Sequence, residues 1–192
     1  GYAAAFRASD LGNKVLLIDR DENLGGVCLN RGCIPSKALL HIVKIVNETQ
    51  HLSNVGVTFG DPEFDIPKIR SHKNKIISQL NGGISQLAKA RNVNVLCGKA
   101  SFINNSAVVV ETSEKKEQIQ FKNCIIASGS TSAMLPNLPL DHPLVLTSKT
   151  ALNLDDIPGS LLIIGGGIIG LELGQVYSCL LYTSPSPRDM PR

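Results

Sequence analysis

The feature that most constrains the fold is a run of four apolar residues that passes directly into a glycine-rich turn. Residues 161–164 are Leu-Leu-Ile-Ile, and they lead into Gly165-x-Gly167-x-x-Gly170 and a predicted helix. Glycines at this spacing permit a tight turn and a close approach of the backbone to a pyrophosphate, and the helix N-terminus supplies unpaired N–H groups. The sequence therefore predicts a βα unit of a Rossmann-like α/β domain that binds a dinucleotide. The alternative is a glycine-rich turn that binds nothing.

The N-terminal residues have the pattern of the second half of another βαβ unit. Residues 2–11 are rich in alanine, with apolar positions that suit a helix packed on a sheet, and residues 15–18 form a short apolar strand that ends at Asp19. Gly1 stands where the last glycine of a similar turn would be. An acidic residue at the end of such a strand can accept hydrogen bonds from both ribose hydroxyls of an adenosine. A strand-terminal aspartate is also common in solvated loops, and that reading stays open here.

The middle of the chain adds helices and short strands between these two units. A charged segment, residues 114–117, predicts a hairpin between two of the strands. A glycine-rich loop is expected at residues 24–27. Helices are expected from Pro35 through 38–46 and over 66–91, the second interrupted or relaxed near Gly82, and strands over 93–96, 107–111, 119–121 and 124–127, the last of them buried.

Composition narrows the class of protein. The 192 residues are 43% hydrophobic and 18% charged, which is the balance of a globular chain and not of a disordered one. No apolar run approaches the roughly 18 residues that a membrane span needs. A net charge of +3, an aromatic content of 4% and the lack of Trp argue against binding of nucleic acid. We therefore expect neither a membrane nor a nucleic-acid partner.

Two of the five cysteines carry the strongest chemical signal. Cys28 and Cys33 have four residues between them and can close a small redox-active disulfide; a metal pair is the alternative. A metal site needs further ligands, and only His41 lies near, so no metal is expected. Cys33 precedes a helix whose N-terminal dipole favours thiolate chemistry. Lys37, one turn further on, could neutralise a developing anion or a phosphate, or be a solvated surface lysine.

Residues 25–41, GGVCLNRGCIPSKALLH, resemble the active-site segment of the dihydrolipoamide dehydrogenases, which are class I pyridine nucleotide-disulfide oxidoreductases. Further segments resemble the same family in the same order, namely residues 1–7, 59–70, 125–130 and 165–174. The reductases of glutathione and of mercuric ion share the cysteine spacing. Val27, the Ile34-Pro35 pair and residues 38–41 favour the lipoamide enzymes.

The resemblance implies a redox route through the two cysteines. In this family FAD lies along the first domain and NAD on the second, and electrons pass from dihydrolipoamide to the disulfide, to the flavin and then to NAD+. Cys28 is then the interchange thiol, and Cys33 lies against the flavin as the charge-transfer thiolate. Lys37 is expected on the FAD side of the site, paired with Glu172. A carboxylate buried there would need a cation, although Glu172 could instead complement the helix dipole.

The resemblance also assigns the cofactor contacts. Residues 127–130 match a second flavin motif, with Ser128 in place of the usual Thr, and the backbone around Ala100, where a glycine is usual, is expected to approach the adenine side. Gly170, rather than Ala, favours NAD over NADP. The candidate contacts are Gly1, Asp19, Gly26, Lys37, Ala100, Ser128 and Gly129 for FAD, and Gly165, Gly167, Ile168 and Gly170 for NAD.

The expected fold class is α/β, in three parts. Residues 1–158 form a Rossmann-like FAD-binding domain with an inserted β-hairpin region, and its first strand and first glycines are expected to be missing. Residues 159–178 begin a second Rossmann-like, NAD-binding domain. Residues 179–192 form a tail foreign to the family, which we interpret as a sequencing artefact. The family's C-terminal His–Glu base has no counterpart here, so we expect the chain alone to be inactive and to aggregate or retain FAD weakly.

The resemblance names partners and a compartment as well. The expected partners are the lipoyl domains of 2-oxo acid dehydrogenase complexes, and the full-length enzyme is expected to be a homodimer. The bacterial cytoplasm and the mitochondrial matrix both fit the reducing interior that the cysteine usage indicates. Two alternatives stay open, namely a glutathione- or mercuric-type reductase and a non-catalytic FAD-binding redox module.

Overall fold

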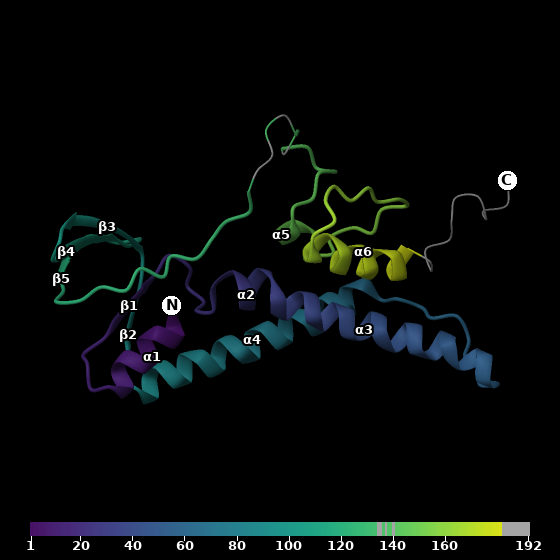
Figure 1. Cartoon of the computed structure of the whole chain (residues 1–192), viewed down its shortest axis with the longest axis horizontal. Coiled ribbons are helices and arrows are strands. Elements are labelled where there is room, and N and C mark those ends of the chain that lie inside the picture. The colour runs from purple at the N-terminus through teal and green to yellow at the C-terminus, as the bar shows by residue number, and fades with distance from the viewer. Residues whose placement is uncertain (134–135, 137, 140, 182–192) are drawn as a thin grey trace. The chain divides into compact units, whose positions relative to one another are not determined.

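The computed structural model describes residues 1–133, 136, 138–139 and 141–181 (Figure 1). Two compact units are present: the first comprises residues 1–30 and 78–131, and the second residues 31–77 and the chain from residue 132 onward. The predicted boundary at residue 158 falls inside the second unit, so the division into FAD- and NAD-binding domains stays a prediction. Residues 182–192, most of the predicted foreign tail, lie outside the described residues.

The first unit contains a two-stranded parallel sheet beside a helix. The predicted N-terminal helix is α1 (Tyr2–Asp10), and the predicted strand is β1 (Leu16–Asp19). β1 pairs in parallel with β2 (Asn94–Cys97), with Asp19 opposite Cys97 at the carboxyl end of both strands. This order of helix and parallel strands is the one that the apolar pattern predicts.

The first unit also contains a three-stranded antiparallel sheet. Its strands are β3 (Lys99–Asn104), β4 (Ala107–Glu111) and β5 (Lys116–Gln120), in that spatial order. A hairpin joins β4 to β5 as predicted, but its turn lies at residues 112–115 and not at 114–117, and β5 begins at Lys116 and not at residue 119, because Glu111 pairs with Lys116. β4 buries Ala107, Val108 and Val110, whereas every residue of β3 is exposed. The sequence does not predict β3, because a strand with no buried face has no alternation of apolar and polar residues.

The second unit is helical and has one apolar core. Its helices are α3 (Cys33–His51), η1 (Leu52–Val55), the first half of α4 (Ile66–Ala90), α5 (Ser148–Ala151) and α6 (Ile168–Leu181). α3 contributes Leu39 and Val43 to the core. The other buried members come from α5, the turn after it and α6, namely Ala151, Leu152, Leu154, Leu173, Val176, Tyr177 and Leu180.

Two predicted strands do not form. Residues 124–127 and 161–164 have no strand hydrogen bonding, and within them Ile126 is 74% exposed and Leu162 is 85% exposed. A strand of a parallel sheet is buried only when neighbouring strands pair with it and helices cover its faces. Within the described part of the chain no strand pairs with either segment, so the prediction of a buried strand at 124–127 is wrong for this structure.

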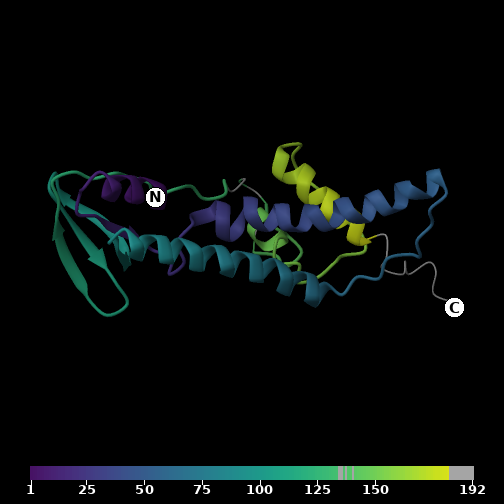
Figure 2. The ribbon, with the colours of Figure 1, turned by 90° about the horizontal axis from the view of Figure 1, so that it is seen from below.

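The helix predictions need three corrections. The loop predicted at 24–27 gives way to α2 (Gly26–Arg31), and the helix expected from Pro35 begins at Cys33. α4 runs without interruption through Gly82 (teal in Figure 2). A helical glycine costs only about 1 kcal/mol relative to Ala, and Ile84 and Ala88, one turn apart, are buried beyond it. In the part of the chain that the structure describes, no helix combines the length and apolar character needed to cross a membrane.

A buried tyrosine gives a test of the second unit's core. The Tyr177 hydroxyl donates a 2.8 Å hydrogen bond to the Ala151 carbonyl oxygen, and both residues are buried. Tyr177→Phe should lower the free energy of unfolding by about 1 kcal/mol, because it removes this donor without opening a cavity. Urea denaturation of the chain measures the change. Tyr2→Phe in α1 is the matched control, and an equal loss in both variants would contradict the assignment.

Candidate active site

The three glycines of the turn before α6 meet three different structural demands. Gly165 has φ +107°, in the left-handed region that side chains disfavour. An added Cβ at Gly170 would lie 2.8 Å from the Gly165 carbonyl oxygen and 3.2 Å from Cγ2 of Ile163. An added Cβ at Gly167 would meet nothing within 4 Å. Gly165 therefore makes the turn, Gly170 permits close packing of α6 on the extended segment before it, and Gly167 leaves open space beside the backbone.

This geometry fits the pyrophosphate of a dinucleotide. α6 begins at Ile168, which is exposed, and the Leu171 N–H is the one that bonds back to the Gly167 carbonyl oxygen at 3.1 Å. The N–H groups before Leu171 lie in the first turn, where the helix dipole favours an anion. No acidic side chain lies in that first turn. The open side of Gly167 is thus a place where phosphate oxygens could approach backbone donors.

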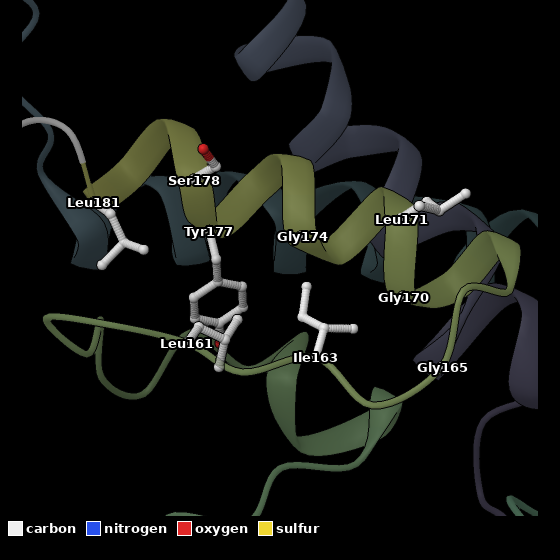
Figure 3. A pocket seen from close by; sticks show the side chains of 9 residues that line it. All are labelled: Leu161, Ile163, Gly165, Gly170, Leu171, Gly174, Tyr177, Ser178 and Leu181. Carbon is white, nitrogen blue, oxygen red and sulfur yellow. The ribbon is translucent and has the colours of Figure 1, made fainter.

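An apolar cavity of about 570 Å³ lies between α6 and the extended segment that precedes it (Figure 3). Leu161 and Ile163 line it from the segment, and Tyr177 and Leu181 line it from α6. Because these side chains are apolar, the cavity suits hydrocarbon packing and not phosphate. The dinucleotide candidate is therefore the backbone of the turn and not this cavity.

The predicted ion pair is confirmed. Lys37, on α3, donates from Nζ to Oε1 of Glu172, on α6. The Lys37 side chain is 61% exposed, whereas that of Glu172 is 19% exposed. The pair joins two residues 135 positions apart in sequence, and it places a cation one helical turn after Cys33.

The two cysteines of the active-site segment lie on successive helices. Cys28 lies within α2, and Cys33 is the first residue of α3. Both are exposed, and the structure has them as thiols and not as a disulfide. The Ser36 hydroxyl donates to the Cys33 carbonyl oxygen at 3.1 Å and so stabilises the first turn of α3. Their redox pairing remains a prediction.

Neither Cys179 nor any cluster of potential metal ligands in the described residues adds a further reactive site. Cys179 is half-buried against the core of the second unit, and burial raises the pKa of its thiol. Burial of this kind makes a thiol less reactive. Over residues 1–133, 136, 138–139 and 141–181, no group of three or more His, Cys, Asp or Glu side chains could hold a metal ion.

The first unit brings together two of the predicted FAD-binding segments. Gly1 precedes α1, and an added Cβ there would lie 4.0 Å from the Ala127 carbonyl oxygen and 3.9 Å from Cδ1 of Leu17. The predicted second flavin motif, residues 127–130, therefore begins beside the N-terminus of α1. The helix N-terminus and the backbone of this motif could together approach one anionic group.

A second junction in the first unit lies at the carboxyl ends of β1 and β2. The Gly98 N–H donates to the Asp19 carbonyl oxygen at 2.8 Å, and the Asp19 carboxylate accepts from the Asp21 N–H at 3.1 Å. An added Cβ at Gly98 would lie 2.7 Å from Cγ1 of Val110, so only glycine fits there. Gly98 belongs to the backbone around Ala100 that is predicted to approach the adenine side, and a glycine next to a strand is the sequence signal for such a close approach.

The structure gives the positions of the remaining predicted FAD-binding residues. Gly26 begins α2, and Ala100 is an exposed residue of β3 opposite Val110. Ser128 and Gly129 are exposed in the extended segment. Their contacts with FAD stay predictions.

The sequence matches those of a known protein family. The sequence model of the pyridine nucleotide-disulphide oxidoreductases matches residues 1–182. The chain is 48% identical over 180 residues to the dihydrolipoyl dehydrogenase of Vibrio parahaemolyticus, and 44% identical over 181 residues to that of Haemophilus influenzae. Each alignment covers 94% of this chain, and the chain spans 38% of the length of these relatives.

A solved structure agrees with the sequence comparison. The copper(II) complex of the HOCl-induced flavoprotein disulfide reductase RclA from Escherichia coli superposes with a TM-score of 0.78 at 30% identity. The superposition covers 93% of this chain and 37% of that one. The α/β fold class expected from the sequence is confirmed, and this chain belongs to the pyridine nucleotide-disulphide oxidoreductase family.

Proposed function

We propose that this chain provides the disulfide and part of both nucleotide sites of a FAD-dependent oxidoreductase that oxidises protein-bound dihydrolipoamide with NAD+. The observation that carries the proposal is the Lys37–Glu172 hydrogen bond. It joins the helix that begins at Cys33 to the helix that follows the dinucleotide turn. The lipoyl substrate is supported by relatives named dihydrolipoyl dehydrogenase, and the flavin by the name of the RclA structure.

The proposed reaction at the cysteines is a thiol–disulfide exchange. A lipoyl thiolate attacks Sγ of Cys28 in the Cys28–Cys33 disulfide, which forms a mixed disulfide and releases Cys33 as a thiolate. The second lipoyl thiolate then attacks the lipoyl sulfur of the mixed disulfide and releases Cys28. The lipoyl group loses two electrons and two protons, and the cysteine pair gains two electrons, so the exchange is balanced once solvent takes up the protons.

The helix that begins at Cys33 supports this exchange electrostatically. Cys33 occupies the first position of a 19-residue helix, so a sulfur released there lies at the end of the helix where backbone N–H groups have no partner within the helix. Lys37, four residues later, adds a positive charge near the same end. Glu172 accepts a charge-assisted hydrogen bond from the Lys37 ammonium, which fixes the position of that positive charge.

The chain's own residues fit both cofactors. When bound, FAD and NAD+ would supply the acceptors for the two electrons that the dithiol loses when the disulfide forms again. Gly1, the N-terminus of α1 and the backbone of residues 127–130 would hold an FAD phosphate, and the Asp19 carboxylate would accept from ribose hydroxyls. The turn from Gly165 to Gly170 would hold the NAD pyrophosphate.

The proposed partners follow from the substrate. Lipoyl groups are carried on protein domains, so the surface around Cys28 would receive a lipoyl domain of a 2-oxo acid dehydrogenase complex. A homodimer is proposed for the full-length enzyme. The relatives named above are bacterial, which favours the bacterial cytoplasm as the compartment.

A hybrid enzyme tests the proposed activity. In it, the matching 180 residues of the Vibrio parahaemolyticus relative are replaced by those of this chain, so that the relative supplies the rest. The hybrid should reduce lipoamide with NADH. Cys28→Ser and Cys33→Ser should each lower kcat at least about a thousandfold, because loss of one thiol prevents the disulfide from forming.

Cys124→Ser is the matched control, because it makes the same change at an exposed cysteine outside the segment. It should retain activity within about twofold. Substantial turnover in either Cys28→Ser or Cys33→Ser would refute the redox pair. A preference of the intact hybrid for glutathione disulfide over lipoamide would refute the lipoyl substrate.

The glycine geometry gives a second test in the same hybrid. Gly170→Ala should lower stability by about 1–3 kcal/mol, because its Cβ meets the Gly165 carbonyl. Gly167→Ala should change stability by no more than about 0.5 kcal/mol. It should nevertheless weaken NAD+ binding about tenfold or more, because the methyl group fills the space left for the pyrophosphate. Denaturation measures stability, and calorimetric titration measures NAD+ binding. A loss of stability in Gly167→Ala, or unchanged stability in Gly170→Ala, would contradict the roles given to these two glycines.

A further inference from the structure

Three main-chain carbonyl groups at the C-terminal end of α5 each accept a hydrogen bond from a side chain on another helix. Tyr177 Oη, on α6, donates to the Ala151 carbonyl oxygen at 2.8 Å. On α4, Lys73 Nζ donates to the Leu152 carbonyl oxygen, and Arg70 Nη2 donates to the Leu154 carbonyl oxygen at 3.0 Å. We call the three donors, Arg70, Lys73 and Tyr177, the α5 clasp.

The segment that the clasp holds is buried and strained. Leu154 is fully buried and has φ +55°, a conformation that a leucine adopts only when its surroundings impose it. The Leu152 and Ala151 side chains are also buried. Three hydrogen bonds to carbonyl groups within four residues therefore hold this segment in an unfavourable backbone conformation.

The clasp includes an unusual buried cation. Lys73 is only 5% exposed. Burial, and next to it the charge of Arg70, lower the pKa of the Lys73 ammonium, whereas Asp155 acts in the opposite direction. Desolvation of a lysine is costly. A leucine or methionine at this position would avoid that cost, so the donor function of Lys73 is the feature that distinguishes it.

The clasp connects the chain before the dinucleotide turn to the helix after it. The held segment continues through residues 156–160 into the extended residues 161–164 and Gly165. Tyr177 lies on α6 and lines the same cavity as Leu161 and Ile163 (Figure 3). Ile163 in turn packs on the backbone of α6, where an added Cβ at Gly174 would lie 2.6 Å from its Cδ1.

We propose that Lys73 and Arg70 are positioning residues for the dinucleotide turn: by holding the backbone after α5, they set where residues 161–165 lie on α6. This inference rests on the proposed function in one respect only, namely that the turn at Gly165–Gly170 receives NAD. Neither side chain is proposed to touch the dinucleotide. Both act through the carbonyl groups of Leu152 and Leu154.

Hydrogen exchange followed by mass spectrometry of the hybrid enzyme, without added NAD+, tests the proposal. Lys73→Met keeps the length of the side chain, removes the donor to Leu152, and removes a buried charge, so overall stability should change little. Exchange of the amides in residues 165–172 should nevertheless rise at least about tenfold. Residues 94–111 of the first unit should exchange as before.

Lys75→Met is the matched control, because it makes the same change at an exposed lysine on the same helix. It should leave residues 165–172 unchanged. Lys73→Arg should restore slow exchange, since it restores a cationic donor. Arg70→Met removes the donor to Leu154 and should raise exchange in the same residues, which provides the test if Lys73→Met fails to fold.

Unchanged exchange in residues 165–172 of a folded Lys73→Met or Arg70→Met variant would overturn the proposal. An equal rise throughout α3 and α6, without rescue by Lys73→Arg, would also overturn it, because it would indicate a general loss of stability. The measurement needs no nucleotide. A failure of the NAD assignment would appear only in the titration of the hybrid enzyme, so the two outcomes are distinguishable.

Discussion

The apolar packing of α3 against α6 is the contact on which the proposed site depends. Leu39 and Val43, one turn apart on α3, share a buried core with Val176 and Leu180, one turn apart on α6. Each buried aliphatic side chain contributes about 1.5–3 kcal/mol, whereas an ion pair as exposed as that of Lys37 contributes about 0–1 kcal/mol. The core therefore holds the two helices together. The Lys37–Glu172 pair fixes the position of the lysine ammonium at the edge of that core.

Local backbone demands explain which parts of the fold the sequence predicts well. Gly165 and Gly170 are needed for reasons within a few residues of themselves, namely a positive φ and a close approach to Ile163, so their spacing alone indicates the turn. The parallel strand β1 and the α1 helix likewise follow from apolar periodicity. The Lys37–Glu172 pair joins distant residues, and only the resemblance to a family made it predictable.

The parts that the sequence did not predict depend on distant partners or on none. Residues 124–127 have the apolar character of a buried strand. A strand also needs a hydrogen-bonded neighbour, and the sequence of the segment does not show whether one is present. β3 has no buried face and so no alternation. The α5 clasp was missed because Arg70 and Lys73 read as ordinary cations on a long helix, until the structure brings distant carbonyl groups to them.

The proposed function depends most directly on whether Cys28 and Cys33 form a disulfide with each other. Trypsin cleaves after Arg31, so the two cysteines fall in separate peptides, residues 21–31 and 32–37. The measurement is a peptide map of the hybrid enzyme under non-reducing conditions after exposure to oxidised lipoamide, with all remaining thiols alkylated. If Cys28 and Cys33 pair, these two peptides are recovered joined by one disulfide, with Cys97, Cys124 and Cys179 alkylated. Recovery of the two peptides as separate alkylated species, or joined to any other cysteine, would contradict that pairing.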